Sequence, residues 1–438
     1  MTECVSTEDS PQVTDTKRNK LTLAIVLLSN FCAVSCTSLL GPFFAIEATK
    51  KGASETVIGL IYSSSEFVVF ITSPVFGHLL SKYRPRTFYM VGVCVFGCCD
   101  IIFGCLDHLP SGIPFIVACF IVRSLEALGT AAVMTSSFAI VGLCFPERIA
   151  TFYAVLKSIS GAAYMIGPAI GGGFYELGGY GLPFWVLGSC TFACGCASCV
   201  MLPHQDAVPS TQRRSSVAVS YALRSPSVWF GALSIYAAYF GFASVGPFFA
   251  NHLTQFRVSQ VNISLIFMTG PAAYSLSAPL WGYLLDKKVS AIPTLWVALC
   301  CLSANYLFFG PAPFLGFVPT LLWLTILMFA FNGFTSAPVI VSAMKCIYQG
   351  ARDMGQRDDG ATLGFLAGII QSSNYIGTFS GPIVSGIVVD HFGFPWAMVG
   401  CSVLVTITWL SLTPYFGVTL WSKGKLKNAN TEDYIEIN

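Results

Sequence analysis

Long apolar stretches constrain this chain more than any other feature. A helix needs roughly 20 apolar residues to cross a bilayer, and such stretches recur along all 438 residues. Only 10% of the residues are charged and 54% are hydrophobic, so a water-soluble protein of this size would lack a charged surface. We therefore predict an all-α integral membrane protein with twelve transmembrane helices, near 21–46, 57–80, 87–106, 113–140, 152–176, 182–202, 228–250, 261–285, 292–310, 318–341, 361–389 and 394–417.

Composition also narrows the function. The net charge of +2 gives no basic surface for nucleic acid. Cysteines gather within apolar stretches, for example at 94–105 and 190–199, where we expect small packing side chains rather than disulfides or metal ligands. We find no nucleotide-binding loop and no pairing of nucleophile and base. We therefore expect no metal, no cofactor and no enzyme activity, and no nucleic-acid partner.

The basic residues fix an expected orientation. With both termini placed in the cytosol, 18 Lys and Arg residues fall in cytosolic segments and three on the opposite side, as the positive-inside rule requires. We call the opposite side the lumenal side. The expected division is a cytosolic N-terminal tail at 1–20, a six-helix bundle at 21–202, a cytosolic central loop at 203–227, a second six-helix bundle at 228–417 and a cytosolic C-terminal tail at 418–438.

Two nearly identical hexapeptides reveal an internal repeat. LGPFFA at 40–45 returns as VGPFFA at 245–250, and 18 of the 55 residues at 28–82 are identical 205 positions later. A second echo links 167–188 with 381–400. Duplicated halves of equal topology are how the halves of a major-facilitator transporter are related. We therefore predict the major-facilitator fold, with two pseudo-symmetric six-helix bundles.

Two loops resemble the cytosolic gate motif of major facilitators. They follow the second and eighth expected helices. Such a motif places a carboxylate and cations at a cytosolic helix end, although a plain positively charged loop would look similar. Ser81 stands where the motif has Asp, which weakens the first copy. The residues of the two copies are Gly77, Ser81, Lys82 and Arg86, and Gly282, Asp286 and Lys287.

The fifth expected helix carries a glycine pattern that resembles the antiporter motif of exchange-type major facilitators. Small residues let helices approach closely, and a proline inside a helix bends it. Ordinary small-residue packing is the alternative reading. The pattern comprises Gly161, Gly167, Pro168, Gly171 and Gly172, and a partial second copy comprises Gly381 and Pro382.

Four ionisable residues lie at membrane depth in the first half, where charges are costly and mark functional candidates. They are Glu66, Asp100, Arg123 and Glu126. One reading is structural, with an Arg123–Glu126 pair one helical turn apart and Glu66 bound by hydroxyls. The other is a cation site with a protonatable carboxylate, to which Tyr164 adds a cation–π face. The second half offers amides and tyrosines but no carboxylate at comparable depth.

Several segments together resemble the vesicular amine transporter family, most of all its polyamine-transporter branch. They are 43–62, 66–69, 120–132 and 167–184. The resemblance implies a transporter that moves spermidine, spermine or a related organic cation into acidic vesicles, and we expect it to act as a monomer. A proton gradient would drive it, and protons and the lipid bilayer would be its other partners. Acidic residues of the monoamine and acetylcholine members are replaced here by Asn30, Asn332, Gln371 and Asn374.

The C-terminal tail contains a candidate sorting signal. Tyr434 and Ile437 fit the tyrosine-based pattern that clathrin adaptors read, and this favours a vesicle or endo-lysosomal membrane. Two other functions stay open at this point. A drug or organic-anion exchanger is disfavoured by the net negative intramembrane cluster. A substrate sensor that does not transport is disfavoured by the antiporter pattern.

Overall fold

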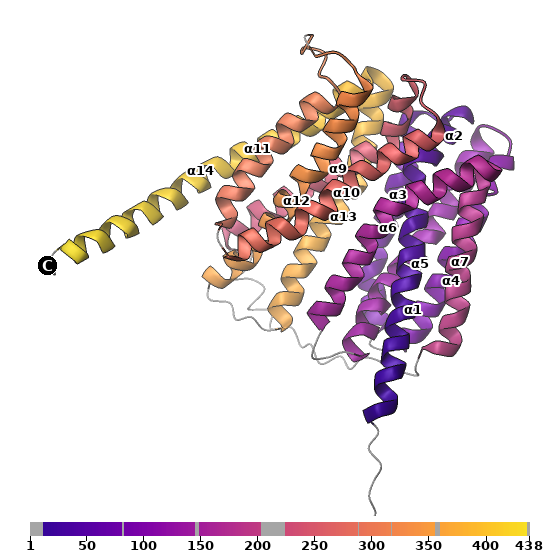
Figure 1. The fold of residues 1–438 in the computed structure, drawn as a ribbon, viewed down its shortest axis with the longest axis horizontal. Helices are drawn as coiled ribbons and strands as arrows, with labels where there is room; N and C mark the ends of the chain where they lie inside the picture. Colours follow the sequence, from indigo (N-terminus) through magenta and orange to yellow (C-terminus); the bar gives the residue numbers. More distant parts are fainter. Residues whose placement is uncertain are drawn as a thin grey trace, which may run out of the picture.

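A computed structural model describes residues 12–80, 83–144, 149–202, 224–287, 289–316, 318–354 and 360–435, and all regular structure in these ranges is helical (Figure 1). The elements are α1 (Gln12–Leu39), the π-helical η1 (Leu40–Phe44), α2 (Ala45–Lys50), α3 (Glu55–Leu79), α4 (Pro85–Phe103), the 3₁₀ turn η2 (Leu106–His108), α5 (Ile113–Cys144), α6 (Ile149–Gly178), α7 (Gly181–Met201), α9 (Pro226–Thr254), α10 (Gln260–Lys287), α11 (Ala291–Phe309), α12 (Leu322–Asp353), α13 (Gly360–Phe392) and α14 (Phe394–Ile435).

Local sequence explains several helix ends. α4 and α9 both begin with a proline, Pro85 and Pro226, at the first helical position, where its fixed φ suits the helix and its missing N–H costs nothing. α6 and α13 are each followed directly by a glycine with positive φ, Gly179 at 74° and Gly393 at 87°, a conformation that glycine adopts without strain. These two turns are equivalent in the second sequence echo.

The helices form two groups that lie side by side (Figure 1). We call α1 to α7, coloured indigo to magenta, the N-terminal half, and α9 to α14, coloured red to yellow, the C-terminal half. The two main seams between the halves are α3 against α13 and α6 against α10. The expected major-facilitator arrangement of two bundles is therefore present, and the two seams correspond to each other in the repeat.

The repeated hexapeptide anchors the core of each half. Phe44 packs on Phe103 with ring centroids 5.2 Å apart, and its counterpart Phe249 packs on Phe309 at 5.1 Å. The backbones differ, however. The first copy forms the π-helical η1, whereas the second lies within the continuous α-helix α9. The Gln260 side chain from the other half donates a hydrogen bond to the Pro42 carbonyl in η1, so the irregular turn lies at a contact between halves.

Ten of the twelve long helices in the described residues are apolar enough and long enough to cross a membrane. The other two, α6 and α13, have 30 and 33 residues and carry the glycine–proline patterns and many small or polar residues. Two helices also extend into segments expected to be tails. α1 begins at Gln12 and α14 continues to Ile435, and Figure 1 shows the end of α14 projecting away from the bundle.

Candidate functional site

A buried ion pair lies in the middle of α5. Arg123 Nη1 lies 2.6 Å from each carboxylate oxygen of Glu126, and Nη2 donates to Ser65 Oγ on α3 at 2.8 Å. Arg123 is 5% exposed and Glu126 is 3% exposed. The spacing of three residues puts both side chains on one face of the helix. The two charges cancel locally, and the Ser65 bond ties the pair to α3.

Glu66 follows Ser65 on α3 and is half-buried at the seam between the halves. Thr378 Oγ1 on α13 donates to its Oε2 at 3.4 Å, a long hydrogen bond that crosses from the C-terminal half. Next to it, the rings of Phe67 and Phe379 stack with centroids 4.9 Å apart. Arg123 and Glu126 both lie within electrostatic range of Glu66. Glu66 is thus a carboxylate at membrane depth that a side chain of the other half reaches.

Asp100 lies on α4 inside the N-terminal half, and it is 1% exposed. Its nearest polar and charged neighbours include Cys36, Glu126 and Arg123, and its Oδ2 has no hydrogen-bond partner in the described structure. Asp100 and Glu126 are almost fully buried in the N-terminal half, whereas Glu66 is half-buried at the seam. The reading of this cluster as a cation site stays a prediction, and Glu66 is the most exposed of its three carboxylates.

Tyr164 on α6 faces this seam and is 40% exposed. Glu66, Arg123 and Tyr375 lie within electrostatic range of its phenol. On α13, Asn374 and Gln371 are half-buried and precede Thr378 by four and seven residues, so they share its helix face. Glu66, Tyr164 and these amides therefore surround one region between the halves.

The C-terminal half has a polar contact of its own, and it is neutral. Asn332 Nδ2 on α12 donates to Asn305 Oδ1 on α11 at 3.1 Å, and Asn305 Nδ2 donates to the Met328 carbonyl at 3.0 Å. Asn305 is 2% and Asn332 is 3% exposed. Both amides are therefore occupied within the half and do not reach the seam.

The glycine pattern of α6 contacts two different partners. A Cβ at Gly167 would lie 2.0 Å from Ser38 Oγ, and one at Gly171 would lie 2.2 Å from Leu39 Cδ2, both on α1. A Cβ at Gly172 would instead meet Ser264 of α10 at 3.2 Å. Gly161 also faces α10, through Ser275, and Pro168 lies inside the continuous helix. The pattern therefore packs α6 on its own half and on the other half at once.

The partial second copy behaves in the same way. A Cβ at Gly381 would lie 2.5 Å from the Phe240 carbonyl oxygen of α9, the counterpart of α1. The carbonyl oxygen of Pro382 would lie 2.2 Å from a Cβ at Gly59 of α3, across the seam. The second copy on α13 thus also packs both against a helix of its own half and against a helix across the seam.

The gate-motif loops make contacts within their own halves. Asp286 lies 3.9 Å from Lys345 Nζ on α12, and Arg86 donates to the Cys199 carbonyl on α7. A Cβ at Gly77 or Gly282 would meet no described atom within 4 Å, which indicates open space at these helix ends. Ser81 and Lys82 lie outside the described residues, and the side chain of Lys287 is not described.

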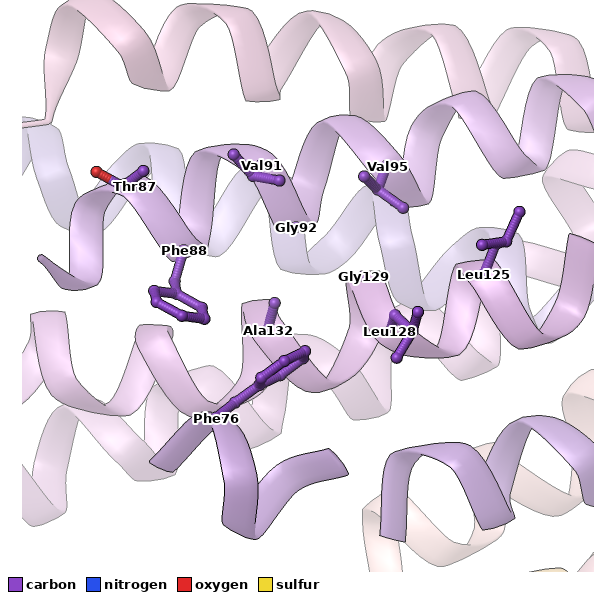
Figure 2. A pocket seen from close by; sticks show the side chains of 10 residues that line it. All are labelled: Phe76, Thr87, Phe88, Val91, Gly92, Val95, Leu125, Leu128, Gly129 and Ala132. Carbon is purple, nitrogen blue, oxygen red and sulfur yellow. The ribbon is translucent and has the colours of Figure 1, made fainter. Parts of the chain in front are cut away.

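An apolar hollow of about 370 Å³ lies between α3, α4 and α5. Figure 2 shows Thr87 at one end as the single hydroxyl among side chains of carbon alone. Val91 and Leu125 in its wall are 57% and 47% exposed, as expected for a surface that faces lipid. A hollow of this composition cannot compensate a charged cargo, so we place the functional site at Glu66.

The remaining sequence candidates fall outside these contacts. Ile437 lies beyond the described residues, and the side chain of Tyr434 near the end of α14 is not described. The cysteines that the structure describes are free thiols. Within the described ranges, no cluster of three or more His, Cys, Asp or Glu residues could hold a metal ion.

Known proteins place the chain in a family. A family model described as Major Facilitator Superfamily matches residues 26–356, and the human MFS-type transporter SLC18B1 is 30% identical over 92% of this chain and 87% of its own. The chain belongs to the vesicular amine transporter family of the major facilitator superfamily. The rat chromaffin granule amine transporter is 21% identical over 78% of this chain and 62% of its own. The protein is therefore a multi-pass membrane transporter and not an enzyme.

A solved structure supports the same fold. A bacterial homologue of the human lysosomal transporter Spinster, in an inward-facing and unoccupied conformation, superposes with a TM-score of 0.70. It is 13% identical and covers 93% of this chain and 99% of its own. The sequence-based assignments of fold class and family are thus confirmed.

Sequence reasoning did not single out the partners that the C-terminal half brings to the site. Thr378 and Phe379 are ordinary residues of a glycine- and serine-rich helix. The one feature of the sequence that could have indicated Thr378 is its spacing from Asn374, since the two residues are one helical turn apart. Ser65 was also missed, although it directly precedes Glu66.

Proposed function

We propose that this transporter exchanges protons for a polyamine or a related organic cation across the membrane of an acidic vesicle. Glu66 carries the proposal, because it is a half-buried carboxylate at the seam that receives a hydrogen bond from Thr378 of the other half. A side chain that both halves reach can sense which side of the protein is open.

The exchange of a proton for a cation follows from the free-energy cost of leaving a buried carboxylate ionised without a partner. An ionised carboxylate in a low-dielectric interior is unfavourable unless a proton or a cation compensates it. Arg123 does not fill this role fully, because both oxygens of Glu126 already bind its Nη1. Glu66 must therefore hold either a proton or a cargo ammonium while the halves move. Lumenal protons displace cargo on one side, and cytosolic cargo displaces protons on the other.

The surroundings of Glu66 suit an elongated cation. Further ammonium groups of a polyamine would meet the amide oxygens of Asn374 and Gln371 and the ring of Tyr164. Asp100 lies behind this layer and is 1% exposed, so it can take a proton but not cargo. We assign it to a second coupled proton. The departures from the acidic pattern of monoamine carriers, at Asn30 and Asn332, favour polyamines over monoamines.

The test is uptake of labelled spermidine into proteoliposomes with an acidic interior, with and without an uncoupler. We expect uptake that the uncoupler abolishes, and we expect Glu66→Gln to remove it in a folded protein. Glu47→Gln is the matched control, because Glu47 pairs with Lys50 at 3.3 Å within one short helix. Serotonin and an organic anion are run beside spermidine.

Three results would contradict the proposal or part of it. Spermidine uptake that does not depend on the proton gradient would contradict the proposed exchange with protons. Full uptake by Glu66→Gln would remove Glu66 from the cargo site. Absence of spermidine uptake by folded protein, with serotonin or the anion transported instead, would leave the family assignment intact and replace the cargo.

A further inference from the structure

The N-terminus of α3 is capped from two sides. Ser54 supplies the local cap, since its Oγ accepts from the Val57 N–H at 3.3 Å and its carbonyl accepts from the Ile58 N–H at 3.0 Å. The first amides of a helix have no partner within it. Two of them point at Asp390 of α13, in the other half. Its Oδ1 accepts from the Glu55 N–H at 2.9 Å and its Oδ2 from the Thr56 N–H at 2.8 Å.

The Thr56 side chain adds a third bond, from its hydroxyl to Asp390 Oδ2. The carboxylate of Asp390 therefore completes the cap of a helix that belongs to the other half of the chain. Its negative charge lies at the positive end of the helix dipole. Bonds in which one partner is ionised are stronger than neutral ones. This set of bonds exists only while the two halves are together at this end.

The corresponding helix of the other seam lacks the second cap in the part of the chain that the structure describes. α10 repeats the local one, because Ser259 Oγ accepts from the Asn262 N–H at 3.3 Å and the Ser259 carbonyl accepts from the Ile263 N–H at 3.0 Å. Glu176 of α6 holds the position of Asp390 in the sequence echo. It is exposed, and the structure gives its carboxylate no hydrogen bond within the described residues.

Other contacts join the two halves at the same end. Asn251 of α9 donates to Glu55 Oε1 and to Thr49 Oγ1, both at 2.8 Å. A Cβ at Gly386 of α13 would lie 2.8 Å from the Glu55 carbonyl oxygen. The α3–α13 seam is thus closed backbone to backbone at the end that the charge distribution assigns to the lumen.

We propose that Asp390 is a lumenal latch: by capping α3 across the halves, its carboxylate favours the state that is closed toward the lumen and open toward the cytosol. The α6–α10 seam has no such carboxylate cap among the described residues, and Gln260 at the start of α10 reaches the other half through the neutral Pro42 carbonyl instead. The proposal rests on alternating access, a property of the transporter class, and not on the identity of the cargo.

The latch is weak enough to open in each cycle. Asp390 is exposed, so water replaces the lost bonds when the halves separate, and a side chain that caps a helix contributes modestly for the same reason. A latch of this strength shifts the balance between two states without locking either of them.

The experiment is hydrogen–deuterium exchange of the full chain in lipid nanodiscs, without cargo and without a gradient. Three variants are compared with the unmodified protein: Asp390→Ala, Asp390→Asn and, as the matched control, Glu176→Ala. The control removes the equivalent carboxylate from the other seam, on the same side of the membrane. Because no transport is measured, failure of the proposed function and failure of the latch are distinguishable.

We expect Asp390→Ala to speed exchange of the Glu55 and Thr56 amides about tenfold, as for a helix end whose closed state is less populated. Asp390→Asn should have a smaller effect, because its amide oxygen still accepts one bond. Exchange at the cytosolic ends of α3 and α13 should slow at the same time, since opening one side closes the other. Glu176→Ala should change neither end.

Two outcomes would overturn the latch. Faster exchange at Glu55 and Thr56 alone, with unchanged cytosolic ends, would make Asp390 a helix cap without influence on the halves. An equal response to Glu176→Ala would show that the two seams do not differ. If Asp390→Ala fails to fold, the same reciprocal pattern is required of Asp390→Asn.

Discussion

The interiors of the two halves bury polar side chains to the same extent, but these side chains differ in their chemistry. In the N-terminal half, α4 and α5 meet around Asp100, Arg123 and Glu126, which are 1%, 5% and 3% exposed. In the C-terminal half, the corresponding helices α11 and α12 meet around Asn305 and Asn332, which are 2% and 3% exposed. Burial is equal, but one half holds charges and the other holds amides.

We propose that the buried charges of the N-terminal half take part in coupling, whereas the buried amides of the C-terminal half only support the fold, and we call the latter the supporting half. Two amides satisfy each other at 3.1 Å and need no counter-ion, so they join two helices at low cost. Buried charges are destabilising unless they are paired, and Asp100 has no cationic partner of its own in the described structure. A transporter gains from such a group only if the charge changes during its cycle. The comparison leads to four predictions.

Removal of Arg123 should have the largest effect. Arg123→Met leaves Glu126 buried without its partner and should lower stability by about 3–5 kcal/mol, measured by thermal unfolding in detergent. The double variant Arg123→Met with Glu126→Met removes both charges and should recover most of that loss. We expect the double variant to retain spermidine uptake, because the pair is internally neutral. Loss of uptake by folded double variant would instead give the pair a direct role.

Asn305→Asp places a carboxyl group in the supporting half, where the described structure offers no arginine beside it. The neutral acid can still accept from Asn332, whereas the ionised form is a buried charge. Stability should therefore fall as the pH rises, by about 1–3 kcal/mol or more at alkaline pH. Thermal unfolding at pH 5 and pH 8 measures it. A pH-independent loss would mean that the site admits water.

Asn332→Ala should have a smaller effect. It leaves Asn305 Oδ1 without its donor and should cost about 1–3 kcal/mol, with gradient-driven uptake unchanged. Unfolding and uptake are measured on the same preparation. Impaired uptake at unchanged stability would contradict the view that this half supports and does not couple.

Asp100→Asn should have the smallest effect on stability, under about 1 kcal/mol, because the amide keeps the shape and removes a buried charge. It should remove one coupled proton. With a lumen about one pH unit more acidic than the cytosol and the membrane potential clamped to zero, steady-state accumulation should then fall about tenfold, the factor that one pH unit gives per proton. Exchange of labelled for unlabelled cargo, without a gradient, is the control and should persist. Unchanged accumulation would remove Asp100 from coupling.

Much of the fold could be predicted because its signals are local. Apolar length indicated the helices, and the repeated hexapeptides indicated two related halves, in which Phe44 and Phe249 now prove to anchor equivalent aromatic clusters. The repeat did not reveal that its two copies differ in backbone conformation. LGPFF, the first five residues of one copy, forms a π-helical turn, whereas VGPFFA lies within an α-helix.

The candidate site, too, could be predicted only in part from the sequence. Arg123 and Glu126 could be paired from their spacing, since residues three apart on a helix are neighbours. The sequence could not tell that Asp100 and Glu126 are almost fully buried within the N-terminal half while Glu66 contacts Thr378 at the seam. All three are carboxylates in apolar stretches, and only the packing of α3 against α13 gives them different surroundings.

The sequence by itself determined the membrane setting, the helical spans, the duplication and the residues that carry charge into the bilayer, because each depends on composition or on spacing along one helix. Only the tertiary structure decided that Thr378 meets Glu66 and that Asp390 caps α3 while its counterpart Glu176 caps nothing in the described residues. Those contacts join residues more than 300 positions apart across a seam. Helix periodicity holds no information about which faces of two separate halves come together.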